Sequence, residues 1–517
     1  MKKKLVAIIL VVNCLSALLA GVVVYGLVFL GGIARQSGQE SGVHGSVNSG
    51  PAGAGIDFNR KTLMDREKTM RSLDNMKEKL FRLKTDDPLI YTRLPEGEFF
   101  KSLISYYLLS RMMSVKAVKL DEEMIRGYKE KGTLLYTLDE NYPLMKKSIY
   151  VNPSRRAGNS PYIKPGTNII IIFVESLSKF FLRDDVHGLT GLMPNIKAME
   201  RESFAFTDMY NSSFPTIKGL IAALGSTIYL LDENVGGTRI PIPCRFLFLS
   251  DIVKALNYTT IHIQSASERF ISMKDFFMQR QSYDCFYGSE SLAIDNIRNM
   301  SGGFGVDDET LFDYVVGWLE KYPGEKPLFL TISTINSHPP FKVKYTIPEA
   351  GGNDMLNALY STDRAFGKFW SYFKKSKYRN NTLLILTADH AMGNNKEYIS
   401  FVKQFEDHYH PYFDRIPCLL YFPGGALRGV TNNTPCVSLD LTPTLLDMMR
   451  LDLANPFMGL SIFSERPFYE RQVVKPEEIN KDMTPEKIES AKKLLGFYFS
   501  LYREDRIVPK DYTVRFH

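Results

Sequence analysis

Residues 382–390 read TLLILTADH, an apolar run that ends in a carboxylate and an imidazole. The run is continuous and too short for an independent helix, which is typical of a strand covered on both faces. Helical stretches such as 307–321 and 357–375 separate similar runs along the chain. We therefore predict an α/β fold with a mostly parallel central sheet flanked by helices on both faces. The other runs of this kind are NIIIIFV (168–174), TTIHI (259–263), PLFLTIST (327–334) and CLLYF (418–422).

Polar side chains that can bind a metal ion follow three of these runs. Glu175 comes directly after NIIIIFV, His338 comes shortly after PLFLTIST, and Asp389 and His390 end the opening stretch. Each of them alone would be read as a loop residue or a helix cap. In a parallel sheet, however, ligands bind beyond the carboxyl ends of the strands, so we expect these side chains at one edge. Carboxylates and an imidazole together suit a divalent cation of the zinc or manganese kind.

A candidate nucleophile lies in the stretch YNSSFPTIKGLIAALGS, residues 210–226. Pro215 ends the preceding segment, and a helix is predicted to begin with Thr216 in its first turn. There the hydroxyl group would face unpaired backbone N–H groups and the positive end of the helix dipole, which favours an alkoxide or a phosphoryl group. A plain N-terminal capping threonine explains the same local sequence.

The composition is that of a globular protein without a nucleic-acid-binding signature. The chain has 517 residues, of which 44% are hydrophobic and 12% aromatic, enough to bury a large core. Its net charge of +7 comes from 64 basic and 57 acidic residues that are interspersed along the chain. We therefore expect no nucleic-acid partner.

The N-terminus is predicted to be a membrane anchor. After MKKK no charged residue occurs from Leu5 through Ala34, which is long enough to span a bilayer. A cleaved signal peptide is the alternative, but the apolar run continues past the small residues at which cleavage would occur. The lysines before the span favour a cytoplasmic N-terminus. We therefore expect a single-pass protein of the cell membrane whose catalytic part is extracytoplasmic, either periplasmic or extracellular.

Composition shifts divide the rest of the chain. A Gly/Ser-rich stretch reads as a flexible tether. It is followed by an amphipathic helix at 57–84 and by a mostly helical stretch at 98–150. The predicted parts are a transmembrane signal anchor (1–35), a flexible linker (36–56), a helical juxtamembrane region (57–165), a catalytic domain (166–470) and a C-terminal extension (471–517).

Four cysteines fall in the part that we expect to be exported. An even number in an oxidising compartment permits disulfides, and four cysteines allow three pairings. Buried free thiols are an equally acceptable interpretation, and no CxxC spacing indicates a metal site. The four are Cys244, Cys285, Cys418 and Cys436.

From residue 166 to about 465 the chain resembles the alkaline-phosphatase superfamily, and within it the lipoteichoic acid synthase and periplasmic phosphoglycerol transferase branch. Each motif alone is weak, but their order over roughly 300 residues is that of the family. The stretches that carry the resemblance are NIIIIFVES, MPNIKAMERESFAFTDMYN, TIKGLIAALGS, residues 249–288, GFGVDDETLFDYV, SHPPF, LTADHAMG, IPCLLYFPG, SLDLTPTLLDMM and GLSIF.

The resemblance implies roles for individual residues. It makes Thr216 the nucleophile and places His338 in the substrate pocket as a hydrogen-bond donor or general acid/base. Arg269, in the sequence ERF, would contact phosphate or glycerol. The chain lacks the C/S-x-P-x-R cassette, which disfavours a sulfatase with a formylglycine nucleophile. The metal ligands that the resemblance implies are Glu175, Thr216, Asp389 and His390.

The resemblance also implies an activity. We expect a metal-dependent transferase that moves a phosphoglycerol-type headgroup from a membrane phospholipid to a hydroxyl of a glycan or polymer through a covalent threonine intermediate. One divalent ion is expected, with manganese favoured and zinc or magnesium as alternatives. A phosphoethanolamine transferase, a phosphodiesterase or phosphatase, and an inactive binding protein are the rival interpretations. The sequence does not indicate the oligomeric state.

Overall fold

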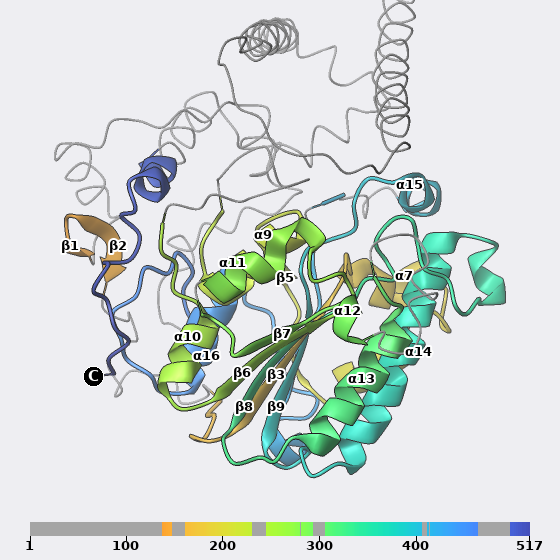
Figure 1. The fold of residues 1–517 in the computed structure, drawn as a ribbon. Helices are drawn as coiled ribbons and strands as arrows, with labels where there is room; N and C mark the ends of the chain where they lie inside the picture. Colours follow the sequence, from red (N-terminus) through yellow and green to blue (C-terminus); the bar gives the residue numbers. More distant parts are fainter. Residues whose placement is uncertain are drawn as a thin grey trace, which may run out of the picture. The chain divides into compact units, whose positions relative to one another are not determined.

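An eight-stranded sheet lies at the centre of the computed structural model (Figure 1). Strands β7, β6, β8, β3 and β9 are parallel neighbours, which confirms the predicted mostly parallel sheet. Strand β10 runs antiparallel to both β9 and β4, and β11 is parallel to β4. In sheet order the strands are β11 (Thr431–Asn432), β4 (Phe204–Phe206), β10 (Cys418–Tyr421), β9 (Thr382–Ala388), β3 (Asn168–Val174), β8 (Leu328–Ser333), β6 (Thr259–Gln264) and β7 (Cys285–Tyr287).

The structure describes residues 137–146, 161–229, 244–279, 281–292, 305–405, 411–412, 414–463 and 497–516. The predicted anchor (1–35), linker (36–56) and amphipathic helix (57–84) lie outside these residues. No helix in the described part of the chain has both the length and the hydrophobicity that crossing a membrane requires.

Helices cover both faces of the sheet, as the alternation of apolar runs and helical stretches predicts. Figure 1 shows α13 and α14 on one side, and α10 and α16 on the other. Every residue of β3 and β9 is buried, which explains why both strands read as unbroken apolar runs. The helices are α7 (Asp184–His187), α8 (Pro194–Arg201), α9 (Thr216–Gly225), α10 (Leu249–Ala255), α11 (Met273–Gln279), α12 (Ser289–Leu292), α13 (Asp308–Lys321), α14 (Asp354–Lys375), α15 (Lys396–Val402) and α16 (Leu441–Met448).

Short elements complete the described fold. Strands β5 and β12 form a separate parallel pair, and single 3-10 turns connect several of the larger elements. The bounds are β5 (Met209–Tyr210), β12 (Cys436–Val437), and turns at Lys179–Leu182, Phe270–Ser272, Pro348–Ala350, Pro423–Gly425 and Ser438–Asp440.

The prediction of a helix is wrong for residues 137–146. Strands β1 (Thr137–Asp139) and β2 (Tyr142–Lys146) form an antiparallel hairpin. The backbone of Lys146 exchanges two hydrogen bonds with that of Asn455, at 2.9 and 2.8 Å. This pairing joins segments more than 300 residues apart, so a strand partner that the local sequence does not reveal overrides the local pattern.

The predicted C-terminal extension contributes to the core where the structure describes it. Residues 497–503 are helical, and the side chains of Phe497, Leu501 and Tyr502 are fully buried. The Tyr502 hydroxyl donates to the backbone oxygen of Ile228 at 2.5 Å.

The four cysteines beyond residue 243 are free thiols, so the structure supports the interpretation without disulfides.

Candidate metal centre

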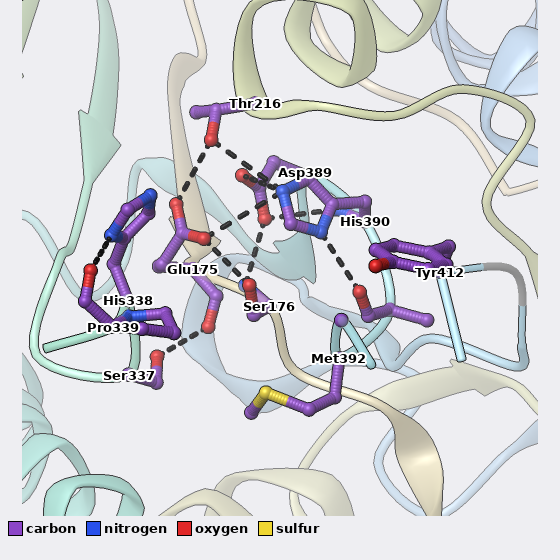
Figure 2. Close-up of polar contacts among 12 residues, drawn as sticks. Glu175, Ser176, Thr216, Ser337, His338, Pro339, Asp389, His390, Met392 and Tyr412 are labelled. Carbon is purple, nitrogen blue, oxygen red and sulfur yellow. Dashed lines mark hydrogen bonds and ion pairs between the residues drawn. The ribbon is translucent and has the colours of Figure 1, made fainter. Parts of the chain in front are cut away.

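Three ligating side chains meet where β3 and β9 end. The two strands are parallel neighbours in register, with Val174 beside Ala388, so Glu175 and Asp389 leave the sheet side by side. Glu175, Asp389 and His390 each place one ligating atom within 4.8 Å of the others, and all three are buried (Figure 2). The strand-end argument thus locates all three correctly, although it says nothing of their distances.

Thr216 joins this group from the first turn of α9. Its Oγ1 donates a hydrogen bond to Oε2 of Glu175 at 3.1 Å and lies 3.5 Å from Nε2 of His390. The side chain is buried, and Figure 2 shows its hydroxyl directed at the two ligands. The structure therefore brings together the four residues that the sequence analysis singled out as metal ligands.

The close approach of α9 to the end of β9 depends on Gly219. A Cβ atom built on this residue would lie only 2.1 Å from the carbonyl oxygen of Asp389. Any side chain would therefore push the first turn of α9 away from the sheet edge and carry Thr216 with it. The spacing of Thr216 and Gly219, three residues apart, places both on the same face of the helix.

The ligating atoms of His390 and Asp389 are better arranged to bind a cation than to hydrogen-bond with each other. Nδ1 of His390 lies 2.8 Å from the carbonyl oxygen of Ala391, which can only accept, so Nδ1 carries the proton. The Nε2 lone pair then faces Oδ2 of Asp389 at 3.3 Å, and this buried Oδ2 accepts no hydrogen bond in the described part of the chain. Two acceptors that face each other at this distance need either a proton or a cation between them, and a backbone partner on the far ring nitrogen is usual for a histidine ligand.

The carboxylates are themselves held in place. Ser176 donates from Oγ to Oε1 of Glu175 at 2.6 Å and from its backbone N–H to Oδ1 of Asp389 at 3.0 Å. Its φ of 56° is in the left-handed region, which is unfavourable for a residue with a side chain. Sequence reasoning missed Ser176, because nothing in its local sequence indicates this backbone conformation.

Glu175 and Asp389 have different pKa values because the two carboxyl groups are buried close together. Burial, followed by the charge of Glu175, raises the pKa of Asp389 to about 7. Burial alone would also raise the pKa of Glu175, but the electrostatic effects of His390 and His338 and the hydrogen bonds from Ser176 and Asp389 together outweigh it. The pKa of Glu175 therefore falls below its ordinary value. Without a cation, Asp389 is therefore the carboxyl group that holds a proton near neutral pH.

Two aromatic side chains pack beside the candidate metal centre. The ring of Phe214 packs edge-on against His390, with centroids 4.6 Å apart, and against Tyr412 at 4.7 Å. Tyr412 also has a left-handed backbone, with φ 70°, and its N–H donates to the carbonyl of Met392 at 2.7 Å. The sequence analysis did not identify these rings, because their proximity to the ligands arises only on folding.

His338 lies on the side of Glu175 away from His390 (Figure 2). The neighbouring Ser337 hydroxyl donates to the carbonyl of Glu175, and the His338 ring is partly exposed (Figure 2). Arg269 is exposed, and its side chain makes no hydrogen bond or ion pair to the four clustered residues within the described regions. Its neighbour Phe270 packs edge-on near His338, with centroids 6.1 Å apart.

The chain is similar to proteins of known family. A family model described as Sulfatase matches residues 167–451, more than half of the chain. Phosphoglycerol transferase I of Citrobacter koseri is 23% identical over 321 residues, covering 58% of this chain and 39% of that protein. The Escherichia coli O81 protein of the same name is 22% identical over 382 residues, covering 68% and 47%. The chain thus spans less than half the length of these relatives.

A solved structure shares the fold. A protein in the alkaline phosphatase superfamily from Vibrio parahaemolyticus superposes with a TM-score of 0.58 at 19% identity, covering 79% of this chain and all of that one. At this identity the likeness bears on the fold alone. It agrees with the mostly parallel, helix-flanked sheet described above.

Gly219→Ala should weaken metal binding. The added methyl group must displace α9 from Asp389, so we expect at least about a tenfold loss of affinity for Mn²⁺, measured by isothermal titration calorimetry. Gly317→Ala in α13 is the matched control, because a Cβ there meets nothing within 4 Å. Equal Mn²⁺ affinities for the two variants would show that the close approach is irrelevant to the centre.

Metal affinity should rise with pH up to about 7. Below that pH Asp389 is protonated, because its pKa is raised to about 7, and a cation must displace the proton. We expect the affinity for Mn²⁺ to fall about tenfold per pH unit below 7, with about one proton released per ion at pH 6. Calorimetry in buffers of different ionisation enthalpy counts the protons. An affinity that is constant between pH 6 and pH 8 would contradict this assignment.

Proposed function

This chain belongs to the sulfatase family, and we propose that it is a phosphotransferase of that fold, moving a phosphoglycerol-type headgroup from a phospholipid to a hydroxyl of a glycan or polymer. The observation that carries the proposal is the position of the Thr216 hydroxyl, 3.1 Å from Glu175 and 3.5 Å from His390 in a buried cluster. The similarity to phosphoglycerol transferases I supports the choice of headgroup.

Glu175, Thr216, Asp389 and His390 would hold one divalent ion, for which manganese is our first choice. When bound, such an ion lowers the pKa of a coordinated hydroxyl and neutralises charge on phosphate oxygens. Glu175 and His390 lie against the Thr216 hydroxyl, and Ser176 holds both carboxylates in place through one hydrogen bond to each.

In the first step, Oγ1 of Thr216 forms a bond to phosphorus as the bond from phosphorus to the lipid alcohol breaks. Thr216 lies at the N-terminus of α9, where the helix dipole favours the negative charge of the phosphoryl group. The product is a glycerophosphorylated threonine, and the diacylglycerol leaves with a proton.

In the second step, the oxygen of an acceptor hydroxyl forms a bond to phosphorus as the bond from phosphorus to Oγ1 breaks, and Oγ1 takes up a proton to restore the threonine. Nδ1 of His338 lies 2.6 Å from the carbonyl oxygen of Pro339, which can only accept a hydrogen bond, so Nδ1 carries the proton of the neutral ring. Nε2 then has the lone pair with which a base takes up the proton of the acceptor hydroxyl. Arg269, whose neighbour Phe270 packs near His338, would contact the phosphate or the glycerol.

We place this chemistry outside the cytoplasm. The predicted anchor at 1–35 would hold the catalytic part within reach of lipid headgroups, and the linker at 36–56 would give it freedom to approach them. A phosphoethanolamine transferase or a phosphodiesterase would use the same threonine. The mass that remains on Thr216 and the fate of the headgroup distinguish these activities.

Thr216→Ala should abolish both turnover and the covalent adduct. We expect at least about a 10⁴-fold loss of transfer from phosphatidylglycerol, because no other group replaces the nucleophile. Intact-mass spectrometry should find a glycerophosphoryl adduct on the wild-type protein and none on the variant, whereas Thr216→Ser should retain a measurable fraction of it. Transfer by the alanine variant at the wild-type rate would exclude the mechanism, and an adduct of another mass would change the headgroup.

His338→Gln should make the adduct accumulate. Glutamine preserves hydrogen bonding but cannot accept the proton of the acceptor hydroxyl, so the second step should slow by about 10² to 10⁴-fold. We expect a larger fraction of glycerophosphorylated Thr216 than in the wild type when phosphatidylglycerol is the only added donor. Less adduct than in the wild type would instead place His338 in the first step.

A further inference from the structure

A buried carboxylate outside the metal centre connects the loops that carry His338 and Arg269. Asp308, the first residue of α13, is completely buried. Its Oδ1 accepts hydrogen bonds from the backbone N–H of Ile335 at 2.7 Å and from the hydroxyl of Ser265 at 2.9 Å. One atom therefore bonds both the segment after β8 and the segment after β6.

The loop from Thr334 to His338 is held from two sides. Toward the metal centre, the Thr334 hydroxyl accepts from the N–H of Glu175 at 3.0 Å, and the Ser337 hydroxyl donates to the Glu175 carbonyl. Away from it, Ile335 and Asn336 both donate their N–H groups to Asp308. A further hydrogen bond joins the same two residues, since Oδ1 of Asn336 accepts from the N–H of Asp308 at 3.1 Å.

The loop that leads to Arg269 is attached to the same carboxylate through Ser265. The Ser265 carbonyl accepts from the N–H of Val306 at 2.9 Å, and its own N–H donates to the carbonyl of Ser333 at 2.9 Å. Gly305 makes this approach possible, since a Cβ on it would lie 2.0 Å from the Ser265 oxygen. Contacts with α13 and β8 therefore fix the backbone of Ser265, from which the chain continues to Arg269.

Helix α14 also holds the Asp308 carboxylate in place. The Thr362 hydroxyl, in the middle of α14, donates to Oδ2 at 2.7 Å. The ammonium group of Lys342 donates to the Gly305 carbonyl, and the N–H of Lys342 donates to the Asn336 carbonyl at 2.9 Å. A buried carboxylate with this many donors is costly to alter, because each donor that loses its partner stays buried and unsatisfied.

We propose that Asp308 is a positioning residue for the substrate-binding half of the site, where it sets the place of the Arg269 and His338 loops relative to each other. The inference rests on the proposed function, in which these two residues meet the transferred group and the acceptor. The ligands of the metal half come from β3, β9 and α9, none of which Asp308 contacts through a hydrogen bond in the described structure.

Asp308→Asn tests this directly. The amide keeps one acceptor oxygen but replaces the other with a donor, so a buried N–H of Asn336 or the Thr362 hydroxyl must rearrange. We expect kcat/KM for the acceptor to fall between about tenfold and 100-fold, as for small misplacements of positioning groups. Mn²⁺ affinity should stay within about threefold of the wild type, because the metal ligands keep their own contacts.

Asp363→Asn is the matched control. Asp363, the neighbour of Thr362 on α14, is also completely buried and accepts backbone N–H groups, those of Asn195 and Ile196 at the start of α8. Its substitution makes the same chemical change and should lower stability similarly. Because α8 carries none of the site residues, kcat/KM per folded molecule should remain within about twofold of the wild type.

A milder pair of variants covers the case in which Asp308→Asn does not fold. Thr362→Val removes one donor to Asp308 without touching either loop, and Thr362→Ser keeps the hydroxyl. We expect a several-fold lower kcat/KM for the valine variant and the wild-type value for the serine variant. The ring proton signals of His338, assigned by their loss in His338→Gln, should shift in Asp308→Asn and Thr362→Val but not in Asp363→Asn.

The outcomes separate the two proposals. Equal losses of kcat/KM in Asp308→Asn and Asp363→Asn, or unshifted His338 signals in Asp308→Asn and Thr362→Val, would overturn the positioning role. A wild-type protein that transfers no headgroup would overturn the proposed function instead. The His338 signals would still report on the positioning role in that case, since they need no substrate.

Discussion

The crowding of acceptor atoms at the ends of β3 and β9 is the constraint on which the site depends. Two parallel strands in register deliver Glu175 and Asp389 side by side, and His390 adds an imidazole whose proton is engaged elsewhere. Buried like this, the carboxylates repel each other, and a proton or a cation must relieve the repulsion. The fit of the site to a cation, the raised pKa of Asp389 and the orientation of the Thr216 hydroxyl thus have one common origin.

The same crowding explains features that local stability would not favour. Ser176 adopts a left-handed backbone, and both carboxylates gain a hydrogen bond from it. Gly219 lies in the first turn of α9, and the helix can approach the backbone of Asp389 because this residue has no side chain. Each feature costs some conformational free energy, and each is found where it holds a ligand or the threonine in place.

The site has two halves with different supports. The metal half consists of side chains at strand ends and at a helix start, joined to one another directly. The substrate-binding half lies on loops, and the buried carboxylate of Asp308 connects these loops to α13 and α14. Residues 334 and 337 bond to Glu175 and residues 335 and 336 bond to Asp308, so one loop connects the two halves.

The apolar runs and the polar residues that follow them were enough to predict the parallel strands, the sheet edge and the residues Glu175, Asp389 and His390. Strand periodicity and helix-start signals are local, and a parallel sheet collects its strand ends at one edge whatever the loops do. The antiparallel β10, the hairpin at 137–146 and the roles of Ser176, Gly219 and Asp308 required the folded chain. Their partners are distant in sequence, 27 residues away for Ile335 and 54 for Thr362 in the case of Asp308, and no local pattern encodes a contact of that separation.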